Sequence, residues 1–168
     1  MKTAESKMGA RRRARVRALH LLYSLEAKER VSRGLSVTDE DLVGAMHELI
    51  LHFPSLIDGG QVQGSDVAED EAYAIRLAQG VVKGLQEIDE ALVAASDHWR
   101  PSRMDVVDRC LLRIGVYELI GVHEVPPAVT INEAVDLAVD YGSGRSASFV
   151  NGLLDGVRKR LQAKTPQK

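Results

Sequence analysis

The segment from Val106 to Gly121 carries apolar residues almost all the way round a helix, and this pattern constrains the fold more than any other. A helix that is apolar on nearly every side has to be covered by several neighbours, so it is expected at the centre of a helical bundle. Ser102 and Asp105 are expected to cap its N-terminus. Cys110 lies on this helix and is expected to be a small buried residue rather than a nucleophile.

Apolar residues also recur at helical spacing along most of the remaining chain. The further helices that this spacing predicts cover Gly9 to the late twenties, 38–53, 69–97, 131–141 and a last segment that begins at Ser146. Capping boxes are expected to start two of them, one at residues 38–41 and one formed by Thr130 and Glu133. Aromatic residues make up only 4% of the chain, whereas sandwiches and barrels use more Tyr and Phe. The sequence therefore predicts an all-α protein.

The charge of the chain is distributed unevenly between its first residues and the rest. Residues 1–17 contain seven basic residues and one acidic residue, a net charge of +6, while the remainder carries −8. An acidic body with a dense basic segment is typical of proteins that bind a polyanion through that segment. Nucleic-acid binding is therefore expected, and a solvated basic tail is the alternative that the charges alone leave open.

The basic segment falls on the first expected helix, which has one apolar side. Ala14, Ala18 and Leu21 belong to that side, and Arg13 and Arg17 fall opposite it at 100° per residue. These guanidinium groups are therefore expected to be exposed. An arginine-rich N-terminal turn opposes the helix dipole, and an external anion is the simplest reason for such a placement.

No arrangement of residues in the sequence predicts catalysis, a metal site or a cofactor. His47 and His52 are five residues apart and point about 140° away from each other on a helix, so they do not form a zinc motif. The loop Gly142–Ser146 matches neither glycine-rich nucleotide motif. It is interpreted as a helix connection, with a phosphate contact inside a longer RNA site as the alternative.

The chain has the features of a cytoplasmic protein. Its apolar runs fall short of the ~20 residues that a membrane span needs, and its basic N-terminus lacks the apolar stretch of a signal peptide. A single cysteine favours a reducing compartment. We therefore expect no membrane partner.

Three segments together resemble the NusB transcription antitermination family. They are residues 11–15 (RRRAR) followed by Leu22-Tyr23, residues 107–114 (VDRCLLRI), and residues 131–138 (INEAVDLA) with 149–155 (FVNGLLD). The resemblance covers about 11–26 and 70–161, whereas 28–69 is weakly matched. It implies an all-α fold of two small helical bundles packed across each other. The chain is then expected to begin with a flexible basic arm over 1–10 and to end with a flexible tail over 162–168. Between them lies a single domain over 11–161, with subdomains of about 11–100 and 101–161.

The resemblance also implies a function as an RNA-binding adaptor without catalysis or cofactor. Family members pair with ribosomal protein S10 (NusE), and the pair binds boxA-type single-stranded RNA. Other Nus factors and RNA polymerase join the assembly, which suppresses termination, notably in ribosomal RNA operons. The alternative is a helical accessory domain like those fused to ribosomal RNA methyltransferases, and the end of the chain at Lys168 makes the free-standing factor the preferred expectation.

The family's functional residues carry over to specific positions of this chain. Asp108 corresponds to a family acid at the surface that faces S10. The RNA-binding positions are Arg11, Arg12, Arg13, Arg15, Tyr23, Arg145 and Phe149. Tyr23 is expected about 20° round the helix from Arg12, outside the apolar stripe, where its ring can stack a base. Phe149 begins the apolar face of its helix, so a core ring and a stacking ring are both open.

One position departs from the family pattern. Many members carry an acidic pair where this chain has Gly144-Arg145. An acidic side chain near RNA contacts bases, whereas Arg145 adds attraction to the phosphate backbone. Tighter and less selective RNA binding is therefore expected there. The RNA sequence preference, the role of 28–69 and the choice between monomer and homodimer stay open.

Overall fold

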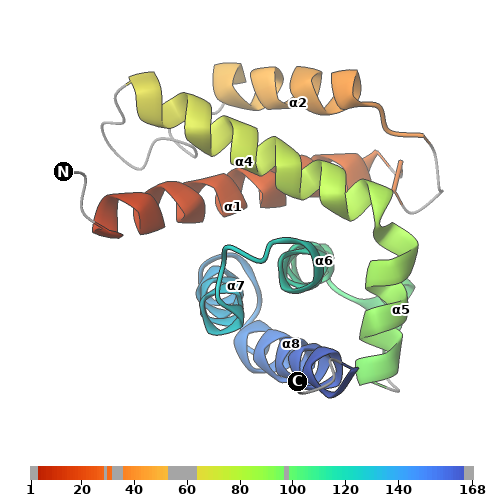
Figure 1. Cartoon of the computed structure of the whole chain (residues 1–168). Helices are drawn as coiled ribbons and strands as arrows, with labels where there is room; N and C mark the ends of the chain where they lie inside the picture. Colours follow the sequence, from red (N-terminus) through yellow and green to blue (C-terminus); the bar gives the residue numbers. More distant parts are fainter. Residues whose placement is uncertain (1–3, 29, 32–35, 53–63, 97–98, 165–168) are drawn as a thin grey trace. The chain divides into compact units, whose positions relative to one another are not determined.

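The computed structural model describes residues 4–28, 30–31, 36–52, 64–96 and 99–164, and the regular elements in these ranges are helices (Figure 1). In chain order they are α1 (Ala4–Ala27), α2 (Asp39–His52), α4 (Gly64–Lys83), α5 (Leu85–Ala95), the 3₁₀ helix η1 (Pro101–Arg103), α6 (Val106–Gly121), α7 (Pro127–Tyr141) and α8 (Ser146–Lys164). The prediction of an all-α protein is confirmed. Over the same ranges, no helix is both long enough and apolar enough to cross a membrane.

The chain folds into two compact units, Met1–Val82 and Lys83–Lys168. Gly84 alone separates α4 from α5, so the single helix expected over 69–97 is in fact two helices. The boundary between the two units, after Val82, also lies before the subdomain boundary expected near residue 100. It does so because α5 packs against α6 and α8 and thereby belongs to the second unit.

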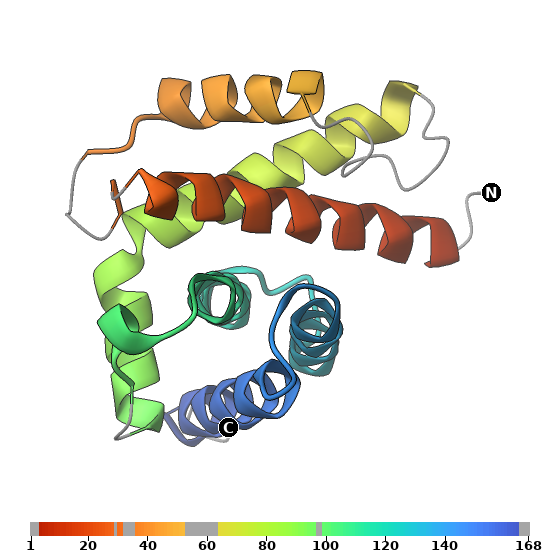
Figure 2. The ribbon, with the colours of Figure 1, turned by 180° about the vertical axis from the view of Figure 1, so that it is seen from behind.

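The first unit contains α1, α2 and α4, which lie side by side in both views of the ribbon (Figures 1 and 2). The apolar stripe of α1 is buried as predicted, with Ala14, Ala18 and Leu21 fully covered. α2 packs against α1 and buries Leu42 and Met46 on its inner face. The helical spacing of Leu42 and Met46 places this apolar row on one side of α2, and that side is the one it buries.

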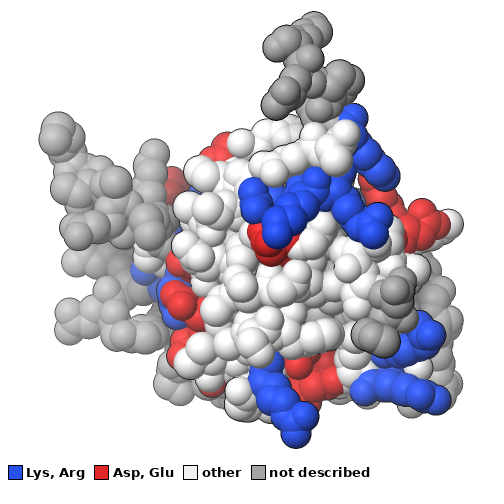
Figure 3. Space-filling model, turned by 90° about the horizontal axis from the view of Figure 1, so that it is seen from below, with Lys and Arg blue, Asp and Glu red and all other residues white. Residues whose placement is uncertain are grey.

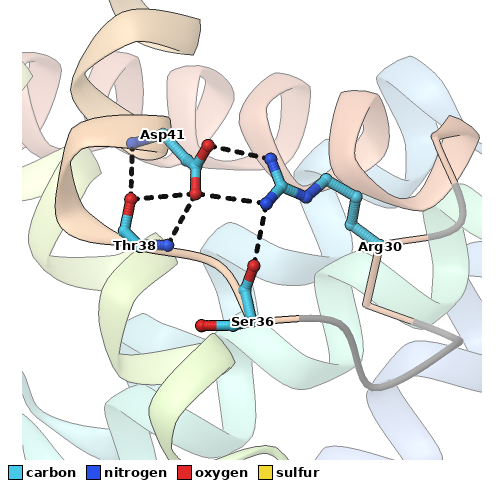
Figure 4. A network of polar contacts seen from close by, with 4 residues as sticks. All are labelled: Arg30, Ser36, Thr38 and Asp41. Carbon is cyan, nitrogen blue, oxygen red and sulfur yellow. Dashed lines mark hydrogen bonds and ion pairs between the residues drawn. The ribbon is translucent and has the colours of Figure 1, made fainter.

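The start of α2 is fixed by a network of polar contacts between four residues (Figure 4). The Thr38 hydroxyl accepts from the Asp41 backbone N–H at 3.1 Å, and the Asp41 carboxylate accepts from the Thr38 backbone N–H at 2.8 Å. This reciprocal pair confirms the capping box predicted at this helix. Arg30 donates to Asp41 at 2.8 Å and to the carbonyl oxygen of Ser36 at 2.8 Å, which ties the end of the preceding segment to the cap.

The second unit is built around α6, which packs against α5, α7 and α8. The bounds of α6 match the predicted helix, and Cys110 is buried on it as expected. Asp105 caps its N-terminus by accepting from the Val107 backbone N–H at 2.8 Å. Gly115 lies so close to α8 that an added Cβ would come within 2.8 Å of the Leu154 side chain. The central position of α6 therefore follows from its apolar surface, as predicted.

Two helix starts differ from the sequence-based expectation. α7 begins at Pro127, one turn before the predicted start at Ile131, because a proline is well suited to the first helical position. Thr130 is therefore buried within the first turns instead of capping the helix. α1 begins at Ala4, so residues expected in a flexible arm are helical from that position onward.

Candidate nucleic-acid interface

The five arginines of α1 differ in how far they are exposed to solvent. Arg11, Arg12 and Arg13 are half-buried. Arg15 retains 2% exposure and Arg17 retains 0%. The expectation that Arg17 is exposed is therefore wrong, although the apolar stripe of α1 was placed correctly.

Asp70 on α4 explains the burial of Arg17. Its Oδ2 accepts from the Nε of Arg13 at 2.7 Å and lies 4.0 Å from the Nη1 of Arg17. Arg13 and Arg17 are four residues apart, so they lie above one another on the face of α1 that meets this acid. A buried guanidinium requires a paired carboxylate, and Asp70 provides it.

Arg11 contacts a second residue of α4 that the sequence did not reveal. Its guanidinium lies 4.6 Å from the centre of the Tyr73 ring, within the range of a cation–π interaction. Arg11, Glu69 and Tyr73 also line a cavity between α1 and α4. The sequence signal for these α4 residues is slight, since an acid and an aromatic residue at helical spacing are common on any amphipathic helix.

Tyr23 is exposed on α1, as the helical wheel predicted, with 49% of its surface accessible. It is separated from Arg12 by eleven positions, or about 16 Å along a helix axis, on nearly the same side. The neighbouring polar groups are turned back to the helix: Ser24 donates to the carbonyl oxygen of Leu21 at 2.8 Å. The Tyr23 ring is therefore an accessible flat surface on α1.

In the second unit, the loop between α7 and α8 presents Arg145. The loop is held by Ser146, whose hydroxyl accepts from the Ser143 backbone N–H at 2.8 Å. Gly142 fits tightly, since an added Cβ would lie 2.5 Å from the Ser146 side chain. Arg145 is exposed at the start of α8, and Phe149 is half-buried one turn later. Because Phe149 is half-buried, part of its ring packs in the core and part is accessible. This result lies between a core ring and a base-stacking ring, the two alternatives that the sequence left open.

Asp108 lies in the first turn of α6, where a carboxylate interacts favourably with the helix dipole. Only 9% of the residue is exposed. Its Oδ1 has no hydrogen-bond partner among the described residues. A partner that reached this acid would thus meet a small exposed surface with an unused acceptor.

Positive and negative side chains lie next to each other at several places on the face drawn in Figure 3. On α8, Asp155 pairs with Lys159 at 2.8 Å and with Arg158 at 2.6 Å. Both contacts lower the pKa of the Asp155 carboxyl, and the contact with Lys159 has the larger effect. The basic charge near the end of α8 is thus partly neutralised by its own helix.

The two histidines of α2 are both exposed, and His47 lies 3.8 Å from Glu71 on α4. Across the described part of the chain, no group of three or more potential ligand residues is positioned to hold a metal ion. Neither histidine therefore belongs to a ligand cluster in these ranges.

Comparison with known proteins identifies the family. The NusB family model matches residues 12–159. The antitermination protein NusB of Myxococcus xanthus is 37% identical over 92% of this chain and 98% of that protein. The NusB protein of Desulfosudis oleivorans is 32% identical over 92% of this chain and 88% of that protein.

Solved structures give the same result. T. maritima NusB is 31% identical with a TM-score of 0.68 over 95% of this chain and 93% of that one. A structure of antitermination factors NusB and NusE in complex with double-stranded RNA is 25% identical, with a TM-score of 0.68 over 91% of this chain and 98% of that one. The extent of these matches shows that the chain belongs to the NusB family.

Proposed function

We propose that this protein is an RNA-binding transcription antitermination factor that acts together with NusE. Family membership over residues 12–159 carries the proposal, because the relatives that match nearly their whole length are named antitermination proteins. The related NusB–NusE structure, which contains RNA, supports both partners. The proposal involves no catalytic step and no cofactor.

The RNA is boxA-type single-stranded RNA in this proposal, and the site combines charge with exposed rings. The half-buried Arg11, Arg12 and Arg13 of α1 supply attraction to phosphates, which is largely independent of sequence, whereas Arg15 and Arg17 are buried. Tyr23 supports the single-stranded preference because unpaired bases stack on exposed aromatic rings. Arg145 and the accessible part of Phe149 supply further contacts to the RNA. Asp108 contacts NusE.

In this proposal the protein binds the nascent transcript in the cytoplasm, and RNA polymerase and other Nus factors belong to the same assembly. A homodimer is not part of the proposal. The methyltransferase-like accessory domain is not favoured, because the protein covers 88% and 98% of the two antitermination relatives described above.

RNA binding measured by fluorescence anisotropy, with and without NusE, tests the proposal. Probes are a boxA-type single strand, a scrambled single strand of equal composition, and a duplex. We expect weak binding by the protein alone, and tighter binding with NusE that favours the boxA-type strand. Equal affinity for all three probes in the presence of NusE contradicts the proposal.

Asp108→Lys separates the two partners. The reversal is expected to weaken NusE binding while the RNA affinity of the protein alone is unchanged, because the acid is proposed to contact NusE only. Glu48→Lys on α2, an exposed acid, is the matched charge control. Equal NusE affinity of wild type and Asp108→Lys removes Asp108 from the interface.

A further inference from the structure

A cavity of about 280 Å³ lies between α1 and α4, entirely within the first unit. It is lined by Ala10, Arg11, Glu69, Asp70 and Tyr73. Its volume is just below the roughly 300–1,000 Å³ typical of small-molecule sites. The cavity therefore suits a single flat group better than a larger ligand.

The free carboxylate of the cavity disfavours a phosphate group. Among the described lining residues, Asp70 is already paired with Arg13, so the carboxylate that would repel an incoming anion is that of Glu69. Asp70 is fully buried and already accepts from Arg13, whereas Glu69 is exposed. Glu69 is therefore the acceptor that the cavity offers to a ligand, and a carboxylate acceptor selects a donor such as an exocyclic amino group.

Arg11 and Tyr73 supply the other half of a base-binding site. The guanidinium lies over the Tyr73 ring at 4.6 Å, and the remaining surface of that ring is flat and can stack an unpaired base. The Nη1 of Arg11 is buried and has no acceptor among the described residues. An acceptor brought by a ligand, such as a base carbonyl oxygen, satisfies that donor after a small movement of the side chain.

We propose that this cavity binds one unpaired nucleobase of the RNA and selects cytosine or guanine. Both bases carry an amino group and a carbonyl oxygen on their pairing edge, which Glu69 and Arg11 bind respectively. Uracil lacks the amino group and adenine lacks the carbonyl oxygen. The cavity is thus a specificity site in which Arg11 contacts a base, distinct from the phosphate contacts of Arg12 and Arg13, and this inference rests on the proposed RNA-binding function.

A short oligouridylate, and the same strand with one central uridine replaced by cytidine, guanosine or adenosine, are the probes. The protein, with and without NusE, is expected to bind the cytidine or guanosine strand roughly fivefold or more tightly than the all-uridine strand. Glu69→Ala is expected to abolish this ratio while leaving affinity for the all-uridine strand unchanged or slightly higher. Glu71→Ala is the matched control, since Glu71 lies on the same helix and does not line the cavity.

Tyr73→Leu provides a second variant that removes the ring face and keeps apolar volume. It is expected to lower affinity for the cytidine and guanosine strands, and thermal unfolding verifies that the variant is folded. A wild-type protein that binds all four strands equally, or a Glu69→Ala protein that retains the ratio, overturns the base site and leaves the proposed function standing. No binding of any strand, with or without NusE, contradicts both.

Discussion

The Nε of Arg13 donates to the Oδ2 of Asp70 across 2.7 Å, and the carboxylate that accepts it is completely buried while Arg13 keeps 29% of its side chain exposed. The same oxygen lies 4.0 Å from the buried guanidinium of Arg17. One acid on α4 therefore organises two arginines of α1. The run of arginines contributes to folding as well as to the charge offered to RNA.

Asp70→Asn is expected to destabilise the protein by about 3–5 kcal/mol, because it removes the buried charge that accepts from Arg13 and lies 4.0 Å from the buried Arg17 guanidinium. Urea unfolding followed by circular dichroism measures the change. Glu48→Gln, at an exposed acid of α2, is the control and should lie within about 0.5 kcal/mol of wild type. An Asp70→Asn protein as stable as the control shows that this ion pair does not support the fold.

The salt dependence of RNA binding is expected to distinguish the arginines of α1. Arg12→Ala should lower the slope of log affinity against log salt by about 0.7, the value for one lost phosphate contact with a single strand. Arg13→Ala should lower it by less, because Asp70 already neutralises this guanidinium. Arg160→Ala on α8 is the control for loss of an exposed charge. Equal slopes for Arg12→Ala and the control remove Arg12 from the RNA site.

Tyr23→Ala is expected to weaken single-stranded RNA binding by about 1–3 kcal/mol, the usual effect of losing one stacked base. The ring is 49% exposed, so its removal should change the melting temperature little. Anisotropy and thermal unfolding on the same preparation measure both effects. A variant that melts early and still binds RNA normally places the ring in the core instead.

Phe149→Ala is expected to change both measurements, because the ring is half-buried at the start of α8. Its stability loss should fall below the roughly 3–5 kcal/mol of a fully buried phenylalanine, and its RNA affinity should fall as well. Phe149→Leu, which keeps apolar volume, should restore most of the stability and little of the affinity. Loss of stability alone assigns Phe149 to the core.

Acidification is expected to release the cap of α2. The backbone N–H of Thr38, followed by the Arg30 guanidinium, lowers the pKa of Asp41 to about 2. Because the folded-state pKa is below the ordinary value, the cap's contribution is present above about pH 4 and is lost as pH falls toward 2. The melting temperature of Asp41→Asn should be lower than that of wild type at pH 7, and the gap should narrow by pH 2. A constant gap contradicts this linkage.

The helices could be predicted from sequence wherever the apolar pattern was unambiguous. The bounds of α6 and the start of α8 at Ser146 were correct, because their apolar rows and flanking polar residues agree. The start of α7 was wrong because Thr130 and Glu133 imitate a capping box within a helix that Pro127 already begins. A local pattern cannot decide between two competing start signals.

The candidate site was predictable only in part. The exposure of Tyr23 followed from the helical wheel of α1, which uses nothing beyond neighbouring residues. The burial of Arg17 and the contact between Arg13 and Asp70 did not, because that acid lies 57 positions away from Arg13. Charge counted along a sequence gives no information about which distant carboxylate will meet it.

The sharing of Asp70 by two arginines has a consequence for transferring this element to other proteins. A peptide that copies the basic stretch of α1 carries the same formal charge but leaves behind the acid that orients Arg13 and covers Arg17. In such a peptide every guanidinium is free to rotate, and each must lose that freedom when it binds. The arginine stretch is therefore not a portable tag: its geometry is a property of the α1–α4 pair, and a graft has to include both helices.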